Sequence, residues 1–204
     1  MIRIILILLL VSATSASACL HCAWNAAGTA SSALTSLFVP VLNAPVSEKP
    51  VKLVKPKTAK QQYAIGYGTL FVDNKRWTKS PEVIIEDAAV NLVHADGNAY
   101  IAGMTNTQFV PIDAFVEQFL AGLRSDEQNK DVRLIEKRNV EVNGVKMTEL
   151  VIHVTINDTP FMYDVLVHTG SKGMIMMMSW THSEIFEELK ADMMSAFSGL
   201  VIKK

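Results

Sequence analysis

Residues 140–181 read VEVNGVKMTELVIHVTINDTPFMYDVLVHTGSKGMIMMMSWT, and this stretch determines the expected architecture. Turn-forming residues interrupt it at Asn143-Gly144, at 157–160 and at 170–173. The segments around these turns are rich in β-branched, aromatic and other apolar residues, which predicts strands over 132–142, 145–156, 161–168 and 174–180. Since each connection is short, successive strands are expected to pair antiparallel and to form a meander.

One face of the predicted meander is apolar. If the second and third connections are two-residue loops at Asp158-Thr159 and Ser171-Lys172, strand alternation defines the residues of this face. They are Leu150, Ile152, Val154, Tyr163, Val165, Val167, Met174, Met176, Met178 and Trp180. A face of this composition must be buried, and we expect a helix to cover it.

The opposite face has a mixed composition. It includes the apolar residues Val151, Leu166 and Met177. The same register places Glu149 opposite His168, so charged groups accompany the apolar ones. Because this face is also partly apolar, we expect cover on both sides of the sheet.

Two amphipathic helices are available to cover the sheet. The helical spacing of the apolar residues over 112–123 predicts the first, with Pro111 in its first turn. The second is predicted to start at Thr181, which has capping-box spacing to Glu184, and to stop at Gly199. The predicted fold class is therefore α+β: an antiparallel sheet meander covered by helices on both faces, in a three-layer α/β/α arrangement.

Further strands are expected before the first helix. Residues 63–72 have an extended pattern, and Trp77 follows a polar turn. Residues 83–94 end in a strand pattern, which Asp96-Gly97, typical of a type I′ turn, joins to a strand over 98–104.

Residues 1–18 have the pattern of a secretory signal peptide. Arg3 precedes the unbroken apolar run 4–11, and small residues follow up to Ala18. The apolar run is far shorter than the ~20 residues that span a bilayer. We therefore expect cleavage after Ala18, export, and a mature chain that begins at Cys19.

Cys19 has two interpretations. A cysteine at the first mature position is what lipoprotein processing requires, and acylation would hold the protein at a membrane surface. Ordinary cleavage would leave Cys19 near Cys22, and the pair could form a small disulfide or take part in redox exchange. The motif for covalent haem attachment is absent because Ala23, and not His, follows Cys22.

The mature chain is predicted to consist of a tether, 19–60, and one domain, 61–204. The tether is rich in Ala and Ser and then in Pro and Lys, and its lysines could contact an anionic membrane. The domain has 13 Lys and Arg against 19 Asp and Glu, a net charge of −6. An acidic domain argues against a dedicated nucleic-acid binder, which needs clustered Lys and Arg.

Three polar residues of the mixed face have the composition of a hydrolase triad. The assumed register places His153 opposite Asp164, beside Ser179. A catalytic triad needs the imidazole between the serine and the carboxylate, whereas Asp164 lies on the middle strand. We interpret the row as a cross-strand ion pair that supports the sheet, and we predict no catalytic residue.

No metal or cofactor site is predicted. The run Met174–Met178 offers thioethers that suit Cu(I), but alternation sends Met177 to the face opposite its neighbours, and core packing is the simpler explanation. The four histidines of the domain lack a zinc-binding spacing. Gly66 and Gly68 do not form a phosphate-binding loop.

Six segments together point to a known family. They are FVDNKRW (71–77), AAVNLVHADGNAYIAGM (88–104), IDAFVEQFLAGL (112–123), VEVNGVKMTELVIHV (140–154), FMYDVLVHTGSKGMIMMMSWT (161–181) and SAFSGLVI (195–202). In this order they resemble the PsbP-like superfamily, with its PsbP, Mog and DcrB types, over residues 61–202. The resemblance implies an antiparallel sheet between helices and a binding or assembly subunit without its own catalysis. It assigns no site residue.

The sequence therefore predicts an exported accessory or interaction protein of the cell envelope, periplasmic or secreted, or anchored as a lipoprotein. Its partner would be an envelope protein that the sequence does not identify. An exposed patch is needed for such a role, and Val151, Leu166 and Met177 are the candidates.

Two alternatives remain open at this point. The first is an envelope enzyme, or a redox or metal-handling protein, that uses His153, Asp164 and Ser179 or the cysteines Cys19 and Cys22; this needs an accessible cleft. The second is a carrier of a small apolar ligand, which needs a cavity under the methionine-rich face.

Overall fold

Strands β7 to β10 form the centre of the structure, a computed structural model that describes residues 50–203. They are β7 (Asn129–Val142), β8 (Val145–Ile156), β9 (Thr159–Gly170) and β10 (Gly173–His182). Each pairs antiparallel with the next, so the predicted meander is confirmed.

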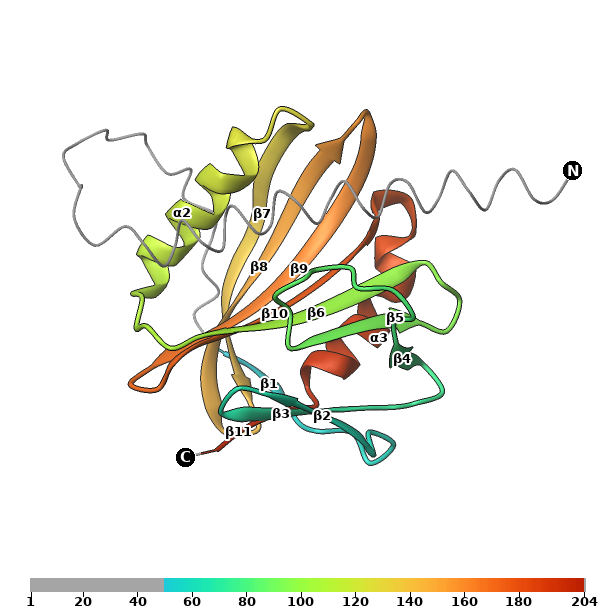
Figure 1. Cartoon of the computed structure of the whole chain (residues 1–204), viewed down its shortest axis with the longest axis vertical. Coiled ribbons are helices and arrows are strands. Elements are labelled where there is room, and N and C mark those ends of the chain that lie inside the picture. The colour runs from blue at the N-terminus through green and yellow to red at the C-terminus, as the bar shows by residue number, and fades with distance from the viewer. Residues whose placement is uncertain (1–49, 204) are drawn as a thin grey trace, which may run out of the picture.

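The meander belongs to an eight-stranded sheet with the order β1-β7-β8-β9-β10-β6-β5-β4 (Figure 1). Strands β4 (Trp77–Lys79), β5 (Val90–His94) and β6 (Ala99–Asn106) extend it antiparallel beyond β10. At the other edge, β1 (Val51–Leu53) pairs parallel with β7. The chain therefore enters the large sheet before Gln61, within the stretch predicted to be a tether.

A second, three-stranded sheet lies below the large one in Figure 1. It is built from β2 (Gln61–Ile65), β3 (Gly68–Val72) and β11 (Leu200–Ile202), all antiparallel, with β3 in the middle. The last strand of the described chain thereby returns to the first hairpin of the domain.

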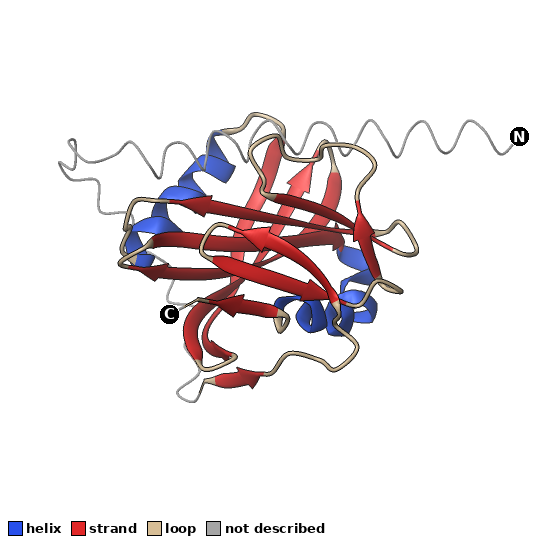
Figure 2. Ribbon diagram, turned by 60° about the horizontal axis from the view of Figure 1, so that its bottom comes forward, coloured by secondary structure: helices blue, strands red, loops and turns tan. Residues whose placement is uncertain are grey.

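The two α-helices of the described residues pack on opposite faces of the large sheet (Figures 1 and 2). Helix α2 (Ile112–Ser125) covers the apolar face, and its buried residues are Phe115, Val116, Phe119, Leu120 and Leu123. Helix α3 (Phe186–Phe197), which follows the 3-10 turn Ser183–Ile185, covers the mixed face. The fold is α+β as predicted. The expected three layers are present only in part, because the small sheet shares the mixed face with α3.

The register between β8 and β9 differs from the assumed one by two residues. Ile156 pairs with Thr159, so the two-residue loop is Asn157-Asp158 and not Asp158-Thr159. Asn157 and Asp158 have φ values of 48° and 65°. A type I′ turn needs positive φ at both central residues, which Asn and Asp tolerate far better than a β-branched threonine. Because the shift is an even number, every residue stays on its predicted face.

The predicted capping box at the start of the last helix is wrong. Strand β10 continues to His182, and α3 begins at Phe186 with no side-chain cap. The Thr181 hydroxyl on β10 instead donates to the backbone oxygen of Asn98 in the β5–β6 turn, at 2.7 Å. Thr181 therefore belongs to the sheet because it has a cross-strand partner there.

The predicted signal peptide and the tether up to residue 49 lie outside the described residues, as do Cys19 and Cys22. Within 50–203, no helix combines the length and the apolar character needed to cross a bilayer.

Candidate functional site

The structure brings together two of the three residues of the predicted polar row. Asp164 on β9 lies directly opposite Ser179 on β10. His153 does not join them, because the two-residue shift places it opposite Met162, while Val151 lies opposite Asp164. The predicted row of three residues is therefore wrong for His153 and correct for Asp164 and Ser179.

Asp164 and Ser179 are fully buried between the sheet and its cover, with no exposed surface. The Ser179 hydroxyl donates to the backbone oxygen of Asp164, at 3.4 Å, and not to its carboxylate. Both carboxylate oxygens of Asp164 lack a hydrogen-bond partner among the described residues. Burial raises the pKa of Asp164 well above its ordinary value, and the Glu149 carboxylate raises it further. Asp164 is therefore a buried acid that favours its neutral form.

Glu149 has the partner that Asp164 lacks. Its carboxylate accepts two hydrogen bonds from Arg138 on the neighbouring strand β7, Nε to Oε2 at 2.6 Å and Nη2 to Oε1 at 2.5 Å. These bonds raise the pKa of Arg138 further, although partial burial acts in the opposite direction. Sequence reasoning placed Glu149 opposite His168, but it lies opposite Leu166, and the role of Arg138 was missed. The cross-strand pairing of Arg138 with Glu149, already possible from the Asn143-Gly144 turn, is the signal that could have found it.

His153 lies at the β7 side of the sheet and contacts polar groups there. Its Nδ1 lies 3.2 Å from the backbone oxygen of Asp131 and 3.4 Å from Nη2 of Arg133. A serine nucleophile needs a histidine within hydrogen-bond reach to take its proton, and among residues 50–203 no histidine hydrogen-bonds to Ser179. The predicted cross-strand ion pair between His153 and Asp164 is therefore wrong, because the two residues do not lie opposite each other.

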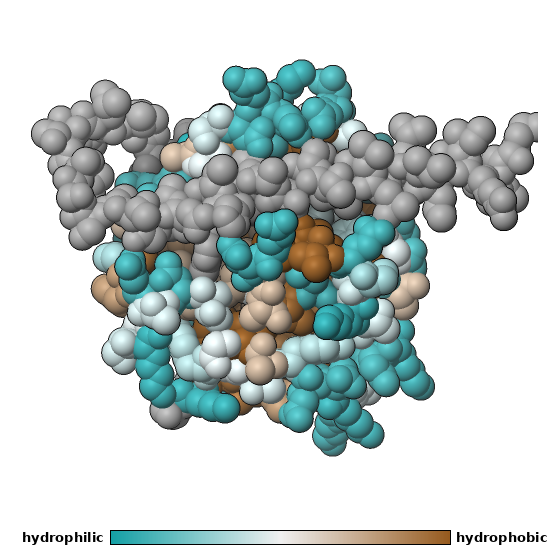
Figure 3. All heavy atoms as spheres, in the orientation of Figure 1, coloured by the Kyte–Doolittle hydropathy of each residue, from teal (hydrophilic) through white to brown (hydrophobic). Residues whose placement is uncertain are grey.

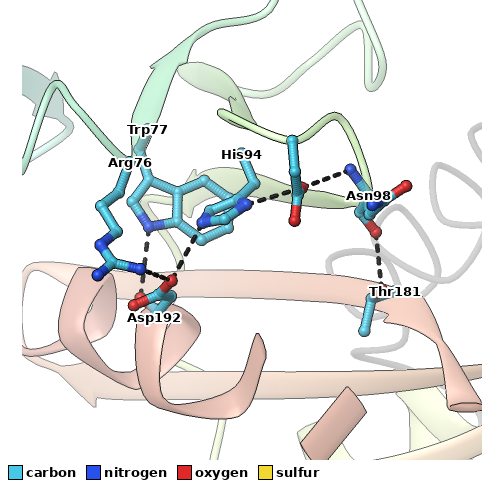
Figure 4. Close-up of polar contacts among 7 residues, drawn as sticks. Arg76, Trp77, His94, Asn98, Thr181 and Asp192 are labelled. Atoms are coloured by element: carbon cyan, nitrogen blue, oxygen red, sulfur yellow. Dashed lines mark hydrogen bonds and ion pairs between the residues drawn. The ribbon is translucent and has the colours of Figure 1, made fainter. Parts of the chain in front are cut away.

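A second polar cluster joins α3 to the β4–β5 hairpin (Figure 4). The imidazole of His94, on β5, lies between two carboxylates: Nδ1 is 2.8 Å from Asp96 and Nε2 is 3.2 Å from Asp192 on α3. Arg76 forms an ion pair with Asp192, and the indole N–H of Trp77 donates to the Asp192 backbone oxygen at 3.3 Å.

These contacts are structural in character. His94 is buried, and both of its ring nitrogens already face protein oxygens. Partial burial raises the pKa of Asp96, but hydrogen bonds from His94 and Asn98 outweigh it and lower the pKa below its ordinary value. Sequence reasoning missed this cluster because Asp192 lies about a hundred residues from the other members.

The other candidate residues are scattered. Met174, Met176 and Met178 pack in the core under α2, whereas Met177 packs under α3. His168 contacts the backbone oxygen of Lys146, and the ring of His182 stacks on Phe161. Across residues 50–203, no group of three His, Cys, Asp or Glu side chains is arranged to hold a metal ion.

The apolar patch expected on the mixed face is absent. Val151, Leu166 and Met177 are buried, because α3 and the small sheet cover them. The large hydrophobic side chains that are exposed in the described chain are Val51, Val54, Val83, Phe109 and Ile135. On the face seen in Figure 3, hydrophobic areas are small and interrupted by hydrophilic side chains.

An open groove of about 390 Å³ lies at the end of the molecule where the small sheet meets the turns of the meander. Its charged or polar side chains are Tyr67, Lys146, His168, Ser171, Lys172 and Lys203, and its other lining residues are Gly144, Val145, Gly170 and Ile202. None of the described residues that line the groove carries a carboxylate, although residues 61–204 have a net charge of −6. Sequence reasoning did not predict it, because its lysines are far apart in the chain.

Comparison with known proteins reveals similarity of fold only. The sequence matches no protein-family model and no curated protein. The solution structure of cyanobacterial PsbP (CyanoP) from Synechocystis sp. PCC 6803 is similar, with a TM-score of 0.53 and 12% identity over 72% of this chain and 95% of that one.

Two further solved structures are more distantly similar. The crystal structure of PA94 from Pseudomonas aeruginosa, a protein of unknown function, gives a TM-score of 0.45 and 12% identity, over 71% of this chain and 97% of that one. LpqN of Mycobacterium tuberculosis, involved in cell envelope biogenesis, gives 0.47 and 12% identity, over 67% of this chain and 83% of that one.

Proposed function

Starting from a chain with the PsbP-like fold, we propose an exported accessory protein of the cell envelope that acts by binding and not by catalysis. The fold by itself is compatible with many functions, so the proposal depends on the residues of this chain. Its partner is proposed to be another envelope protein.

One observation supports a binding role above the others. Asp164 and Ser179, the residues that sequence reasoning considered for catalysis, have no exposed surface, and His153 lies opposite Met162 instead of beside them. A substrate could not reach them without displacing the elements that cover this face of the sheet. The open groove of the described chain lies elsewhere, and its lysines are suited to holding an anion.

The N-terminal sequence supports the envelope location. Residues 1–18 have the pattern of a signal peptide, and Cys19 would be the first residue after cleavage. We propose that Cys19 is acylated and that the tether places the domain at the membrane surface, where the tether lysines add electrostatic attraction.

Export and anchoring are tested by expressing the full chain in a bacterium with a metabolically incorporated palmitate analogue. We expect loss of residues 1–18, a labelled protein in the membrane fraction, and loss of the label in Cys19→Ser. The matched control, Cys22→Ser, should keep the label. An unprocessed chain in the cytoplasm would contradict export. A processed chain without label would contradict acylation and leave export standing.

The binding role is tested in a deletion strain complemented with Ser179→Ala. We expect this variant to restore the wild-type phenotype fully, because Ser179 makes a single long hydrogen bond in the interior. Failure of a folded, correctly located Ser179→Ala variant would favour the enzyme alternative.

A further inference from the structure

The groove at the end of the molecule concentrates positive charge. Lys146 at the start of β8, Lys172 in the β9–β10 turn and Lys203 after β11 all line it. All three side chains are exposed, and none forms an ion pair with a described carboxylate. Three unpaired ammonium groups around one hollow attract an anion more strongly than the same charges spread over a surface.

The remaining contacts of the groove show which protons are available to a ligand. The Lys172 ammonium donates one hydrogen bond to the backbone oxygen of Lys203, at 3.1 Å, and keeps its other two protons free. The Tyr67 hydroxyl donates to the backbone oxygen of Gly173, also at 3.1 Å. His168 uses Nδ1 toward the backbone oxygen of Lys146, at 3.2 Å. Tyr67 and His168 therefore form a fixed wall, and the lysines supply the donors.

The groove lies beside the segment through which the tether enters the domain. Asn143, in the turn that precedes the groove residue Gly144, donates its backbone N–H to the oxygen of Leu53 at the end of β1, at 2.9 Å. Its side-chain oxygen accepts the backbone N–H of Lys55, at 2.8 Å. The groove and residues 51–55 of the tether therefore lie at the same end of the described chain.

We propose that this groove binds the phosphate of an anionic phospholipid headgroup, with Lys146, Lys172 and Lys203 as its ligands. A phosphate offers several strong acceptor oxygens to point-charge donors such as lysine. The choice of a lipid over a free phosphate rests on the proposed function, which places the tether at a membrane. Headgroup binding would hold the domain with this end toward the bilayer.

The experiment measures sedimentation with vesicles of phosphatidylglycerol and phosphatidylcholine, using the mature chain, residues 19–204, purified as the unacylated Cys19→Ser variant. The groove variant combines Lys146→Gln, Lys172→Gln and Lys203→Gln. The matched control combines Lys75→Gln, Lys79→Gln and Arg124→Gln, which remove the same amount of charge. All three positions are exposed: Lys75 precedes β4, Lys79 is on β4 and Arg124 is on α2. Thermal unfolding checks that both variants are folded.

We expect the partition coefficient of the groove variant for vesicles that contain phosphatidylglycerol to fall at least about tenfold. Each lysine near an anionic surface adds to the electrostatic binding free energy, and the variant lacks three of them. The control variant should lose less than about threefold, and pure phosphatidylcholine should bind neither. Equal losses in both variants, or no binding by the unsubstituted protein, would overturn the proposal.

A separate arm identifies the source of the phosphate. If inorganic phosphate at millimolar concentration shifts the NMR signals of the groove residues while vesicles do not bind, the ligand is a free phosphate and the lipid proposal fails. Vesicle binding that the groove variant loses and the control variant keeps, in a chain that cells neither export nor acylate, would support the groove as a lipid site and overturn the proposed function instead.

Discussion

The two faces of the large sheet are formed by the same strands but bury different chemistry. Under α2, the buried residues of β8, β9 and β10 are apolar apart from Thr148 and the Tyr163 hydroxyl, and none is ionisable as an acid or base near neutral pH. Under α3 and the small sheet, the same strands bury Glu149, Asp164 and Ser179 among apolar residues. Because side chains alternate along a strand, the sequence neighbours Asp164 and Val165 point to opposite faces of the sheet. The face of Asp164 accommodates acidic side chains, whereas the face of Val165 does not.

The mixed face tolerates Glu149 because β7 supplies a cation at the right register. Arg138 reaches Glu149 with two hydrogen bonds, so the buried carboxylate is paired. Among the described residues no such donor reaches Asp164, and burial raises its pKa well above the ordinary value, which favours the protonated form. The mixed face thus accommodates Glu149 by pairing it with Arg138, and Asp164 by favouring its protonated form. The apolar face has no charged partner for an acid.

Placing an acid on the apolar face should have the largest effect. In Val165→Asp the new carboxyl would be fully buried among apolar side chains. Keeping it protonated at pH 7 costs about 4 kcal/mol, and its lost hydrogen bonds with water add to this. We expect the free energy of unfolding in urea to fall by at least about 4 kcal/mol. Val165→Thr is the size-matched control, and a loss below about 1 kcal/mol for Val165→Asp would contradict the distinction between the faces.

Removing the cation of the mixed face should cost less. Arg138→Met leaves the Glu149 carboxylate buried and unpaired, and breaking such a pair typically costs about 3 kcal/mol. The double variant Arg138→Met with Glu149→Leu removes both charges, and we expect it to recover most of this loss. A double variant as unstable as the single one would show that the pair contributes through packing and not through charge. Urea unfolding of all variants measures the coupling.

Replacing Asp164 with a neutral residue should increase the free energy of unfolding, because the pKa of Asp164 is raised in the folded state. Because the folded-state pKa is raised, the contribution of the neutral carboxyl is present at low pH and is lost as the pH rises through the folded-state pKa. Asp164→Asn has no such charge, so its advantage over the wild type should grow from pH 5 to pH 9 and reach about 1 kcal/mol or more. A constant difference across this range would mean that Asp164 is already ionised in the folded protein at pH 5, as it is in the unfolded chain, and would contradict the raised pKa.

Sequence patterns predicted the elements better than the contacts between them. The strands and helix α2 follow from turn residues and from periodicity, which are local signals. The register of β8 against β9 was wrong by two residues, because the turn depends on which residues accept positive φ, and Asn157 and Asp158 accept it. The error kept every face correct but joined His153 to Asp164 falsely.

The sites depended on long-range placement, which no local pattern contains. The groove joins lysines from β8, the β9–β10 turn and the end of the chain, and the His94 cluster joins β5 to α3. The strand β1 was missed because a three-residue strand in a segment rich in Pro and Lys gains its stability from pairing with β7 and not from its own composition.

The smallest expected effect concerns the role of Thr181, which is either the last cross-strand contact of the mixed face or a helix cap. In Thr181→Val the Asn98 backbone oxygen loses its donor while the size of the buried side chain is kept, so we expect a loss of about 1 kcal/mol in the free energy of unfolding. Glu184→Gln should change it by only a few tenths, because the 3-10 turn that contains Glu184 has no side-chain cap. If Glu184→Gln cost as much as Thr181→Val in the same urea titration, Thr181 would act as a helix cap and not as the last cross-strand contact of the sheet.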